Sequence, residues 1–195
     1  MQSGQMQMMA NSQTNTNIAD SLTDLLYSTI DLATGATEFY PFSKRFGDAG
    51  ENYGRTNVEL GNQVPAKQSW AVTAFKIAIY NDAVLTPAEV ATLISVLSET
   101  DLFFQVDNSP KIHIPLTEAL GLSSGIVTAD ATNNHQTNIQ NVFGGQFKFK
   151  GNPFLLGPQT SFEMRLKHHA TAGIPAELNG VKIRISMVRE YDRLV

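Results

Sequence analysis

The side chains that could do chemistry in this chain are few, and their spacing does not assemble a catalytic centre. Gly121-Leu-Ser-Ser-Gly125 matches the G-x-S-x-G pattern, in which a serine nucleophile sits on a sharp strand-to-helix turn. That turn belongs to a sheet of alternating strands and helices, whereas Ser123 lies between a predicted hairpin and a long polar segment. The match is interpreted as coincidence, and the sequence predicts no catalytic residue and no enzyme.

The four histidines are too dispersed to predict a metal centre. His168 and His169 are adjacent on a predicted strand and therefore point to opposite faces, while His113 lies on a hairpin strand and His135 in the polar segment. The chain lacks the His-x-His pair of cupin metal sites, and without cysteine it can form neither disulfides nor thiolate metal sites. We interpret the histidines as structural or surface residues and predict no metal and no cofactor.

Binding of nucleotides or nucleic acids has little support in the sequence. No phosphate-binding glycine loop is present, and Gly144-Gly145 is interpreted as a bulge or turn before a strand. Basic residues on the predicted C-terminal strands could form one stripe if those strands are neighbours: Lys148, Lys150, Arg165, Lys167, Lys182 and Arg184. The aromatic residues that could stack on bases (Phe147, Phe149 and Phe162) fall on the opposite, buried face. We expect a solvated or subunit-facing stripe and no specific nucleic-acid recognition.

The composition is that of one folded, weakly charged domain. The length of 195 residues fits a single β-sandwich, and only 16% of the residues are charged, against about 25% in most soluble proteins. Asn, Gln, Ser and Thr replace the missing charges, which suits packing against neighbours because burying neutral polar groups costs less than burying ions. Residues 1–146 carry 6 basic and 14 acidic side chains, and residues 147–195 carry 8 and 4. Complementary ends could steer assembly, or the basic end could be a solvated sheet face.

No segment predicts export or a membrane span. Met1 to Asn17 contain no Lys or Arg and no apolar core of signal-peptide length, and no run approaches ~18 apolar residues. The sequence therefore predicts that the chain stays in a cytoplasm unless it leaves as part of a particle. Residues 1–17, rich in Gln, Asn and Met, predict a flexible N-terminal arm ahead of one domain at 18–195.

Two similar corners organise the predicted β structure. Val64-Pro-Ala-Lys-Gln-Ser-Trp70 and Leu156-Gly-Pro-Gln-Thr-Ser-Phe162 each place a proline turn, a Gln and a Ser-aromatic pair before a β-patterned run. Proline marks the beginning of a strand because its φ is fixed and its nitrogen cannot donate to a ladder. The repetition predicts two long strands that enter an antiparallel sandwich from similar corners.

The strand predicted at 70–80 is apolar on both faces. Strict alternation places Ala71, Thr73, Phe75, Ile77 and Ile79 on one face, and Trp70, Val72, Ala74, Ala78 and Tyr80 on the other, where Lys76 is the only charge. A strand that is apolar on both faces is covered on both sides. We therefore expect another element, such as a helix, to lie over the outside of this sheet.

The remaining elements follow from periodicity and turn signals. Thr86-Pro-Ala-Glu89 is a capping box ahead of the stripe Val90, Leu93, Ile94 and Leu97, so one short helix is predicted at about 87–100. Residues 18–32 fit either a helix or a strand, and the turn at Gly35 followed by 37–42 predicts a hairpin. Residues 102–106 and 111–116 predict a second hairpin, and alternation at 162–167 and 181–187 predicts further strands. Together they predict an all-β fold, a single jelly-roll sandwich or barrel with one inserted helix.

The order of these motifs resembles the jelly-roll capsid proteins of tailless icosahedral bacteriophages, including those with an internal membrane. The order runs from residues 62–70 through a strand, a short helix and the 102–116 hairpin to residues 151–162 and a last strand ending at Arg189. The resemblance implies a non-enzymatic viral structural protein, a capsid subunit that assembles with itself into capsomers of an icosahedral virion. Other capsid proteins would be its partners, and in some members an inner membrane of the virion would be another.

A second hypothesis is a β-sandwich binding module, such as a carbohydrate-binding domain or a phage spike or receptor-binding domain. Such a module predicts an exposed aromatic platform, for which Trp70 and Tyr80 are the candidates. The apolar pattern around both residues leads us to expect that they are buried. The sequence therefore favours the shell protein, located in the virion and made in the host cytoplasm.

Overall fold

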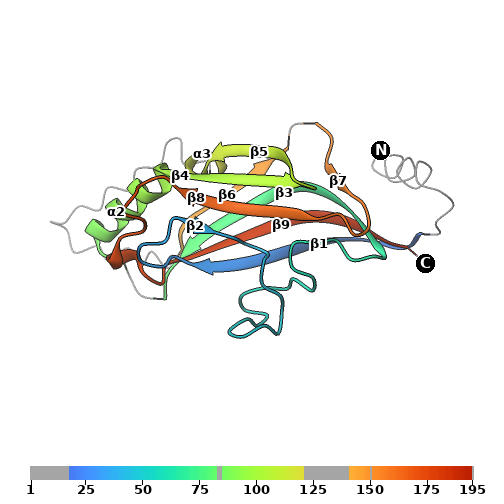
Figure 1. Ribbon diagram of the computed structural model, residues 1–195, viewed down its shortest axis with the longest axis horizontal. Helices are drawn as coiled ribbons and strands as arrows, with labels where there is room; N and C mark the ends of the chain where they lie inside the picture. Colours follow the sequence, from blue (N-terminus) through green and yellow to red (C-terminus); the bar gives the residue numbers. More distant parts are fainter. Residues whose placement is uncertain (1–17, 83–84, 121–140, 150, 195) are drawn as a thin grey trace.

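The chain folds into two antiparallel β-sheets that pack face to face (Figure 1). The computed structural model describes residues 18–82, 85–120, 141–149 and 151–194. The first sheet has the strand order β1 (Ile18–Asp31), β9 (Lys182–Leu194), β3 (Gln68–Tyr80) and β6 (Asn141–Lys148), and β7 (Phe154–Leu156) also pairs with β3. The second sheet has the order β2 (Glu38–Phe39), β8 (Phe162–His168), β4 (Thr100–Val106) and β5 (Ser109–Pro115).

This strand order is that of a jelly roll. Strands far apart in the sequence are neighbours in both sheets, as where β1 pairs with β9 and β2 with β8. The pairing of β1 with β9 runs from Ile18 opposite Leu194 to Asp31 opposite Lys182, so it joins the two ends of the described chain. The predicted fold class, all-β with a single short inserted helix, is confirmed.

The two similar corners of the sequence lie against each other. Val64 N–H donates to the carbonyl oxygen of Thr160 (3.0 Å), and Phe162 N–H donates to that of Asn62 (2.9 Å). The first corner leads into β3 of one sheet and the second into β8 of the other, and the rings of Trp70 and Phe162 are 5.8 Å apart between the sheets. The prediction that both strands enter the sandwich from similar corners is confirmed.

The structure of residues 18–42 decides between the helix and the strand considered for residues 18–32 and corrects the hairpin predicted after Gly35. Residues 18–31 form strand β1 rather than a helix. The hairpin predicted at 37–42 is wrong, because β2 pairs with β8 in the other sheet. The turn after β1 is held by residues 173–181: Gly35 N–H donates to the carbonyl oxygen of Ile174 (2.8 Å), and Leu32 N–H to that of Val181 (2.8 Å). These bonds lead the chain across to the second sheet instead of back along β1.

A β-bulge in β3 corrects the predicted faces of that strand. Val72 pairs with Arg189 and Ala74 with Val188, so Thr73 is an extra residue that shifts the alternation by one. The inward face is therefore Trp70 and Val72 before the bulge, and Phe75, Ile77 and Ile79 after it. The outward face carries small or polar residues such as Ala74 and the exposed Lys76. The outward face thus carries mainly alanine, of which Ala71 and Ala74 are buried, and α2 (Pro87–Ser98), the helix expected to cover this face, does not lie over it.

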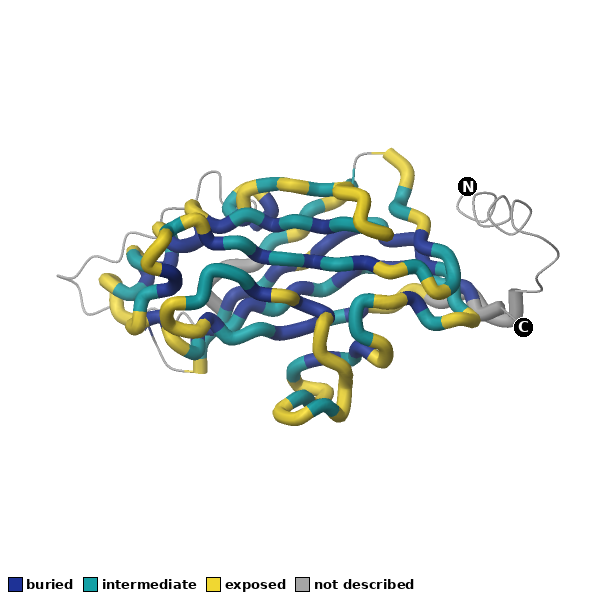
Figure 2. Tube along the Cα trace, viewed as in Figure 1, coloured by how far each residue is buried: buried dark blue, intermediate teal, exposed yellow. Residues whose placement is uncertain are grey.

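The core lies between the two inner faces, as the alternation of buried and exposed positions shows (Figure 2). Along β8 the residues Phe162, Met164 and Leu166 are buried, and along β9 the same holds for Ile183, Ile185 and Met187, as predicted. Phe104 of β4 is fully buried and reaches Phe75 of β3 in an edge-to-face contact at 5.2 Å between ring centroids. Such interdigitation of large side chains from both sheets fills a sandwich core.

The predicted helix is α2 (Pro87–Ser98), and its N-terminus is the capping box read from the sequence. Thr86 Oγ1 accepts from Glu89 N–H, and the Glu89 carboxylate accepts from Thr86 N–H. Val90, Leu93 and Leu97 are buried as expected. The helix lies at one end of the sandwich (Figure 1), where it contacts α3 (Leu116–Ala119), the 3-10 turn η1 (Ala176–Leu178) and the beginning of β4. It closes this end rather than covering a sheet.

The predicted hairpin at 102–116 is confirmed as β4 and β5, with a shorter turn. Only Asp107 and Asn108 connect the strands, and both have positive φ (46° and 61°), as a type I′ turn requires. Ile112 and Ile114 pack against the core, while the alternating positions of β5 are exposed. β5 is the edge of its sheet, and its Pro110, Lys111 and Pro115 are residues that discourage another strand from pairing there.

Candidate functional site

Residues 42–64 form a long segment that covers the outer edge of β1, and we call it the covering segment. Thr56 Oγ1 donates to the carbonyl oxygen of Tyr27 (3.1 Å), and Tyr27 N–H donates to Asn57 Oδ1 (2.7 Å). Asn57 Nδ2 also donates to the carbonyl oxygen of Leu25 (2.7 Å). These bonds pair the free edge of β1 with side chains, which leaves less of that edge open to another strand.

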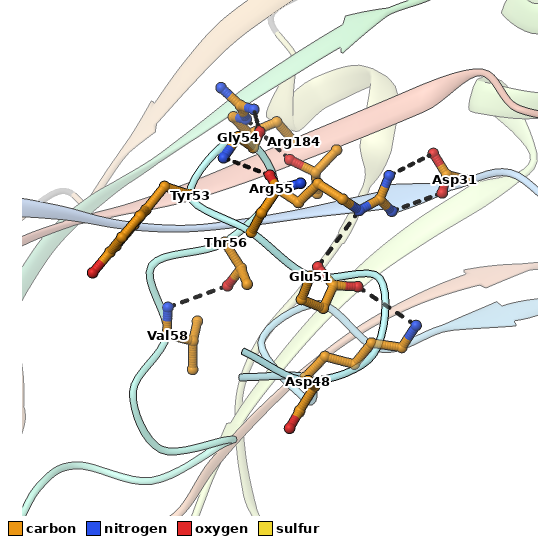
Figure 3. A network of polar contacts seen from close by, with 12 residues as sticks. Asp31, Asp48, Glu51, Tyr53, Gly54, Arg55, Thr56, Val58 and Arg184 are labelled. Carbon is orange, nitrogen blue, oxygen red and sulfur yellow. Dashed lines mark hydrogen bonds and ion pairs between the residues drawn. The ribbon is translucent and has the colours of Figure 1, made fainter. Parts of the chain in front are cut away.

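An ion-pair network holds the covering segment in place (Figure 3). Arg55 Nη2 lies 2.7 Å from Asp31 Oδ2 on β1, and Arg55 Nε lies 3.5 Å from Glu51 Oε2. Lys44 Nζ lies 3.5 Å from the other oxygen of Glu51, whose side chain is only 5% exposed. The hydrogen bond that Arg55 donates to Asp31 raises the pKa of Arg55 although burial opposes this, so the guanidinium remains charged. A buried carboxylate between two cations is satisfied and rigid.

Arg184 of β9 ties the same segment to the outer face of the first sheet. Its guanidinium lies over the rings of Tyr27 (5.2 Å to the centroid) and Tyr80 (5.6 Å), and its Nε donates to Thr29 Oγ1 (3.0 Å). Its Nη2 donates to the carbonyl oxygen of Gly54. Arg184 therefore serves as a structural clamp between three strands and the covering segment.

A cavity of about 190 Å³ lies between the covering segment and the inner face of the first sheet, and we call it the Arg189 cavity. Its sheet side carries Asp24, Trp70, Arg189 and Tyr191 from β1, β3 and β9. Its other side carries residues of the covering segment, among them Tyr53, Glu59 and Gln63, and Gln68 at the beginning of β3 also lines it. The inner face of the sheet is thus polar at this end, whereas the rest of it is apolar.

Arg189 is a buried residue, with an exposed fraction of only 8%, and its guanidinium lies close to two aromatic rings. Its guanidinium carbon lies 4.2 Å from the Trp70 ring centroid and 5.0 Å from that of Tyr191. Its one hydrogen bond to the described residues runs from Nη2 to Asp24 Oδ2 at 3.4 Å, and its buried Nε–H has no acceptor among them. Burial lowers the pKa of Arg189, and Asp24 offsets part of this. A guanidinium has five N–H donors, and only one hydrogen bond joins Arg189 to the described residues.

The mouth of the Arg189 cavity carries an exposed aromatic pair. Phe46 and Tyr53 stack with ring centroids 3.9 Å apart and an angle of 23° between the ring planes. Both line the cavity, and they remain 44% and 67% exposed. The sequence prediction concerned Trp70, which is 2% exposed as expected, and Tyr80, which is half-buried. The exposed aromatic surface therefore lies on Phe46 and Tyr53 of the covering segment, which the sequence did not mark as a binding surface.

A second polar cluster lies on the outer face of the other sheet. His113 Nε2 of β5 lies 2.8 Å from Asp101 Oδ2 of β4, and His169 Nε2 lies 3.0 Å from the same oxygen. His113 also stacks on Phe103, with ring centroids 4.2 Å apart. Burial raises the pKa of Asp101, but the hydrogen bonds from both histidines outweigh it, and the net shift is downward. The cluster is an ion-pair site that joins β4, β5 and the end of β8.

Asp101→Asn is expected to destabilise the fold at neutral pH by about 1 kcal/mol, because the two histidines are half exposed. The pKa of Asp101 is lower in the folded state than its ordinary value of 3.8, so its carboxylate stabilises the fold above that value. The stability difference between wild type and variant should therefore shrink as the pH falls below about 4. Urea unfolding of both proteins from neutral to acidic pH measures it. A difference independent of pH would show that Asp101 acts through packing alone.

The structure places the sequence candidates apart rather than in one site. His168 is buried beside Thr100 (Nδ1 to Oγ1, 3.2 Å) and His169 is exposed, so the prediction of opposite faces is confirmed. Gly144 and Gly145 lie within β6 rather than before a strand, and a Cβ at Gly145 would come within 2.2 Å of the carbonyl oxygen of Leu120. The Gly121–Gly125 motif with Ser123, His135, Lys150 and the arm at 1–17 lie outside the described residues.

The basic residues do not form the single stripe considered from the sequence. Arg165 and Lys167 lie on β8 in the second sheet, whereas Lys148, Lys182 and Arg184 lie on β6 and β9 in the first. Arg165 pairs with Glu38 (3.5 Å) and lies over the Phe103 ring (4.9 Å). Lys182 pairs with Asp82. Arg165 and Lys182 are thus held in ion pairs with neighbouring segments.

Neither of two comparisons with known proteins gave a relative of this chain. No protein-family model matches it. No curated protein matches it either. Among the residues that the structure describes, no three histidine or acidic side chains are grouped so that they could hold a metal ion. Within the same residues, no helix is both long enough and apolar enough to cross a bilayer.

Proposed function

We propose that the protein is a shell subunit of an icosahedral virion and assembles with copies of itself into capsomers. The observation that carries the proposal is the strand order, β1-β9-β3-β6 facing β2-β8-β4-β5. Jelly rolls of this kind build viral capsids, lectin domains and cupins. The interior favours a capsid protein over a cupin. The inward positions from Phe75 to Ile79 and from Phe162 to Leu166 are apolar and buried, whereas a cupin holds a metal site inside its barrel.

The surface also suits repeated contacts between copies. Few of its side chains are charged, and several of the charged ones are held within the chain, Arg55 and Arg165 in ion pairs and Arg184 in hydrogen bonds. The edge of β5 discourages strand pairing, and part of the edge of β1 is covered. Copies would then meet through sheet faces and loops, each contact weak and multiplied by symmetry.

Light scattering and negative-stain imaging of the purified full-length chain test the proposal. We expect rings or closed particles far larger than the 21.3 kDa monomer. A chain that stays monomeric at every concentration, and that also fails to enter particles with other shell proteins, would contradict it. The binding-module hypothesis would then explain the fold better.

Removal of residues 1–17 is expected to separate folding from assembly. The pairing of β1 with β9 begins at Ile18, so the shortened chain keeps every described strand pair and should unfold at a temperature close to that of the full chain. Assembly should be reduced at least several-fold, since an arm of this composition becomes ordered on a partner. The measurement is the assembled fraction by light scattering at matched concentration. Normal assembly of the shortened chain would remove any role for the arm.

A further inference from the structure

We propose that the Arg189 cavity binds one neutral sugar ring, such as the terminal residue of a glycan. This inference does not depend on the shell function, because it rests on the cavity alone. The volume of about 190 Å³ is enough for a single six-membered ring, since an engineered cavity of about 150 Å³ holds benzene. Two linked rings would not fit inside, so any further ring would lie at the mouth.

The polar groups around the cavity include both hydrogen-bond donors and hydrogen-bond acceptors. Gln68 Oε1 accepts from Trp70 Nε1 (2.9 Å), which leaves the amide N–H groups of Gln68 as donors. Gln63 Nε2 donates to the carbonyl oxygen of Gln159 (3.2 Å), which leaves Gln63 Oε1 as an acceptor. Arg189 adds guanidinium donors that meet only one acceptor among the described residues. A sugar hydroxyl both donates and accepts, so one ring can satisfy both kinds of group.

The charges of the lining favour a neutral ligand over an anion. Asp24 and Glu59 carry one negative charge each and Arg189 one positive charge, so the charged lining residues sum to −1. Both carboxylates act on Arg189, which is therefore already partly neutralised. An anionic ligand would be repelled by this net charge, whereas sugar hydroxyls can donate to the carboxylates and accept from the guanidinium.

Apolar surface beside these polar groups fits the faces of a sugar ring. Leu26 and Val58 line the interior and are buried. At the mouth, Phe46 supports one face of Tyr53, whose ring remains largely exposed. A supported aromatic ring with a free face is a platform on which the C–H face of a sugar can pack, and its stacking on Phe46 reduces the entropy lost on binding.

Saturation-transfer NMR on the full-length chain tests the pocket with free glucose, galactose, mannose and N-acetylglucosamine, and with glucuronic acid as an anionic probe. We expect signal transfer to at least one neutral sugar and weaker transfer to glucuronic acid. Tyr53→Ala should weaken binding of that sugar about three- to tenfold, as expected for loss of one aromatic contact. Glu59→Ala should weaken it by a similar factor through a lost acceptor.

Tyr40→Ala is the matched control, because Tyr40 is also an exposed tyrosine (41%) but does not line the cavity. It should bind the sugar as the wild type does, and thermal unfolding should show that all three variants remain folded. Absence of transfer to every neutral sugar would overturn the proposal. Equal binding of the sugar by all three variants would overturn it too, because the binding site would then lie elsewhere. Stronger binding of glucuronic acid than of the neutral sugars would show that the cavity prefers an anion, which would overturn the proposed ligand class.

Discussion

Phe104→Ala is expected to lower the free energy of unfolding by about 3–5 kcal/mol, one of the two largest effects that we predict. The Phe104 side chain is fully buried and contacts three aromatic rings from other strands. The ring centroids of Phe75, Phe154 and Phe162 lie 5.2, 6.0 and 6.4 Å from its own. Loss of the ring would leave a cavity between the two sheets, because strands held by their ladders cannot close it. Urea unfolding followed by tryptophan fluorescence measures the change, since Trp70 also lies in this core.

Phe103→Ala provides the matched control on the same strand. Phe103 points to the outer face, where it stacks on His113 and lies beneath Arg165. Its removal should cost only about 1 kcal/mol, the contribution of exposed aromatic and cation–π contacts. If both variants lost similar stability, the assignment of Phe104 to the inner face and Phe103 to the outer face of β4 would be wrong.

Gly173→Ala is expected to cost about 3–5 kcal/mol or to prevent folding. Gly173 has a φ of +68°, and a Cβ there would come within 2.3 Å of the carbonyl oxygen of Gly35. That contact lies between two backbone segments, and both are fixed by hydrogen bonds around Ile174 and Ala36. The side chain therefore adds a steric overlap to the cost of the left-handed conformation.

Gly180→Ala separates these two causes. Gly180 has a φ of +86°, but no atom lies within 4 Å of the position that its Cβ would take. This variant should lose only about 1–2 kcal/mol, the cost of the left-handed conformation. Thermal and urea unfolding of both variants give the comparison. Equal losses would show that the contact between Gly173 and Gly35 relaxes without cost.

Local patterns predicted the elements whose stability is decided locally. The capping box at Thr86 and the alternation along β8 and β9 agreed with the structure, and the β4–β5 hairpin was predicted with a turn two residues longer than the observed one. In each case a few adjacent residues carry the signal, and burial on one face reinforces it. The paired corners at Val64 and Thr160 were also readable, because the same turn chemistry occurs twice.

The errors arose where a distant segment decides the local structure. The sequence around Thr73 carries no mark of a bulge, because the bulge depends on the pairing of Val72 with Arg189 and of Ala74 with Val188, more than 110 residues away. The chain after Gly35 crosses to the other sheet because residues 173–181 hold it there. The same holds for the sites, since the Arg189 cavity and the Asp101 cluster each join three or more separate segments. Only the proximity of Asp101 and His113, diagonal neighbours in one hairpin, had a local signal.

The pairing of β1 with β9 sets the time at which this domain can complete its fold. β9 lies between β1 and β3, so until residues 182–194 have been synthesised β1 lacks its partner strand and β3 lacks one of its partners. Pairings this distant in sequence form slowly, because the loop must close before the contacts stabilise it. During translation β1 would leave the ribosome with its apolar face uncovered, and it must be kept from pairing with neighbouring nascent chains. The first sheet can thus be completed only once β9 has been synthesised.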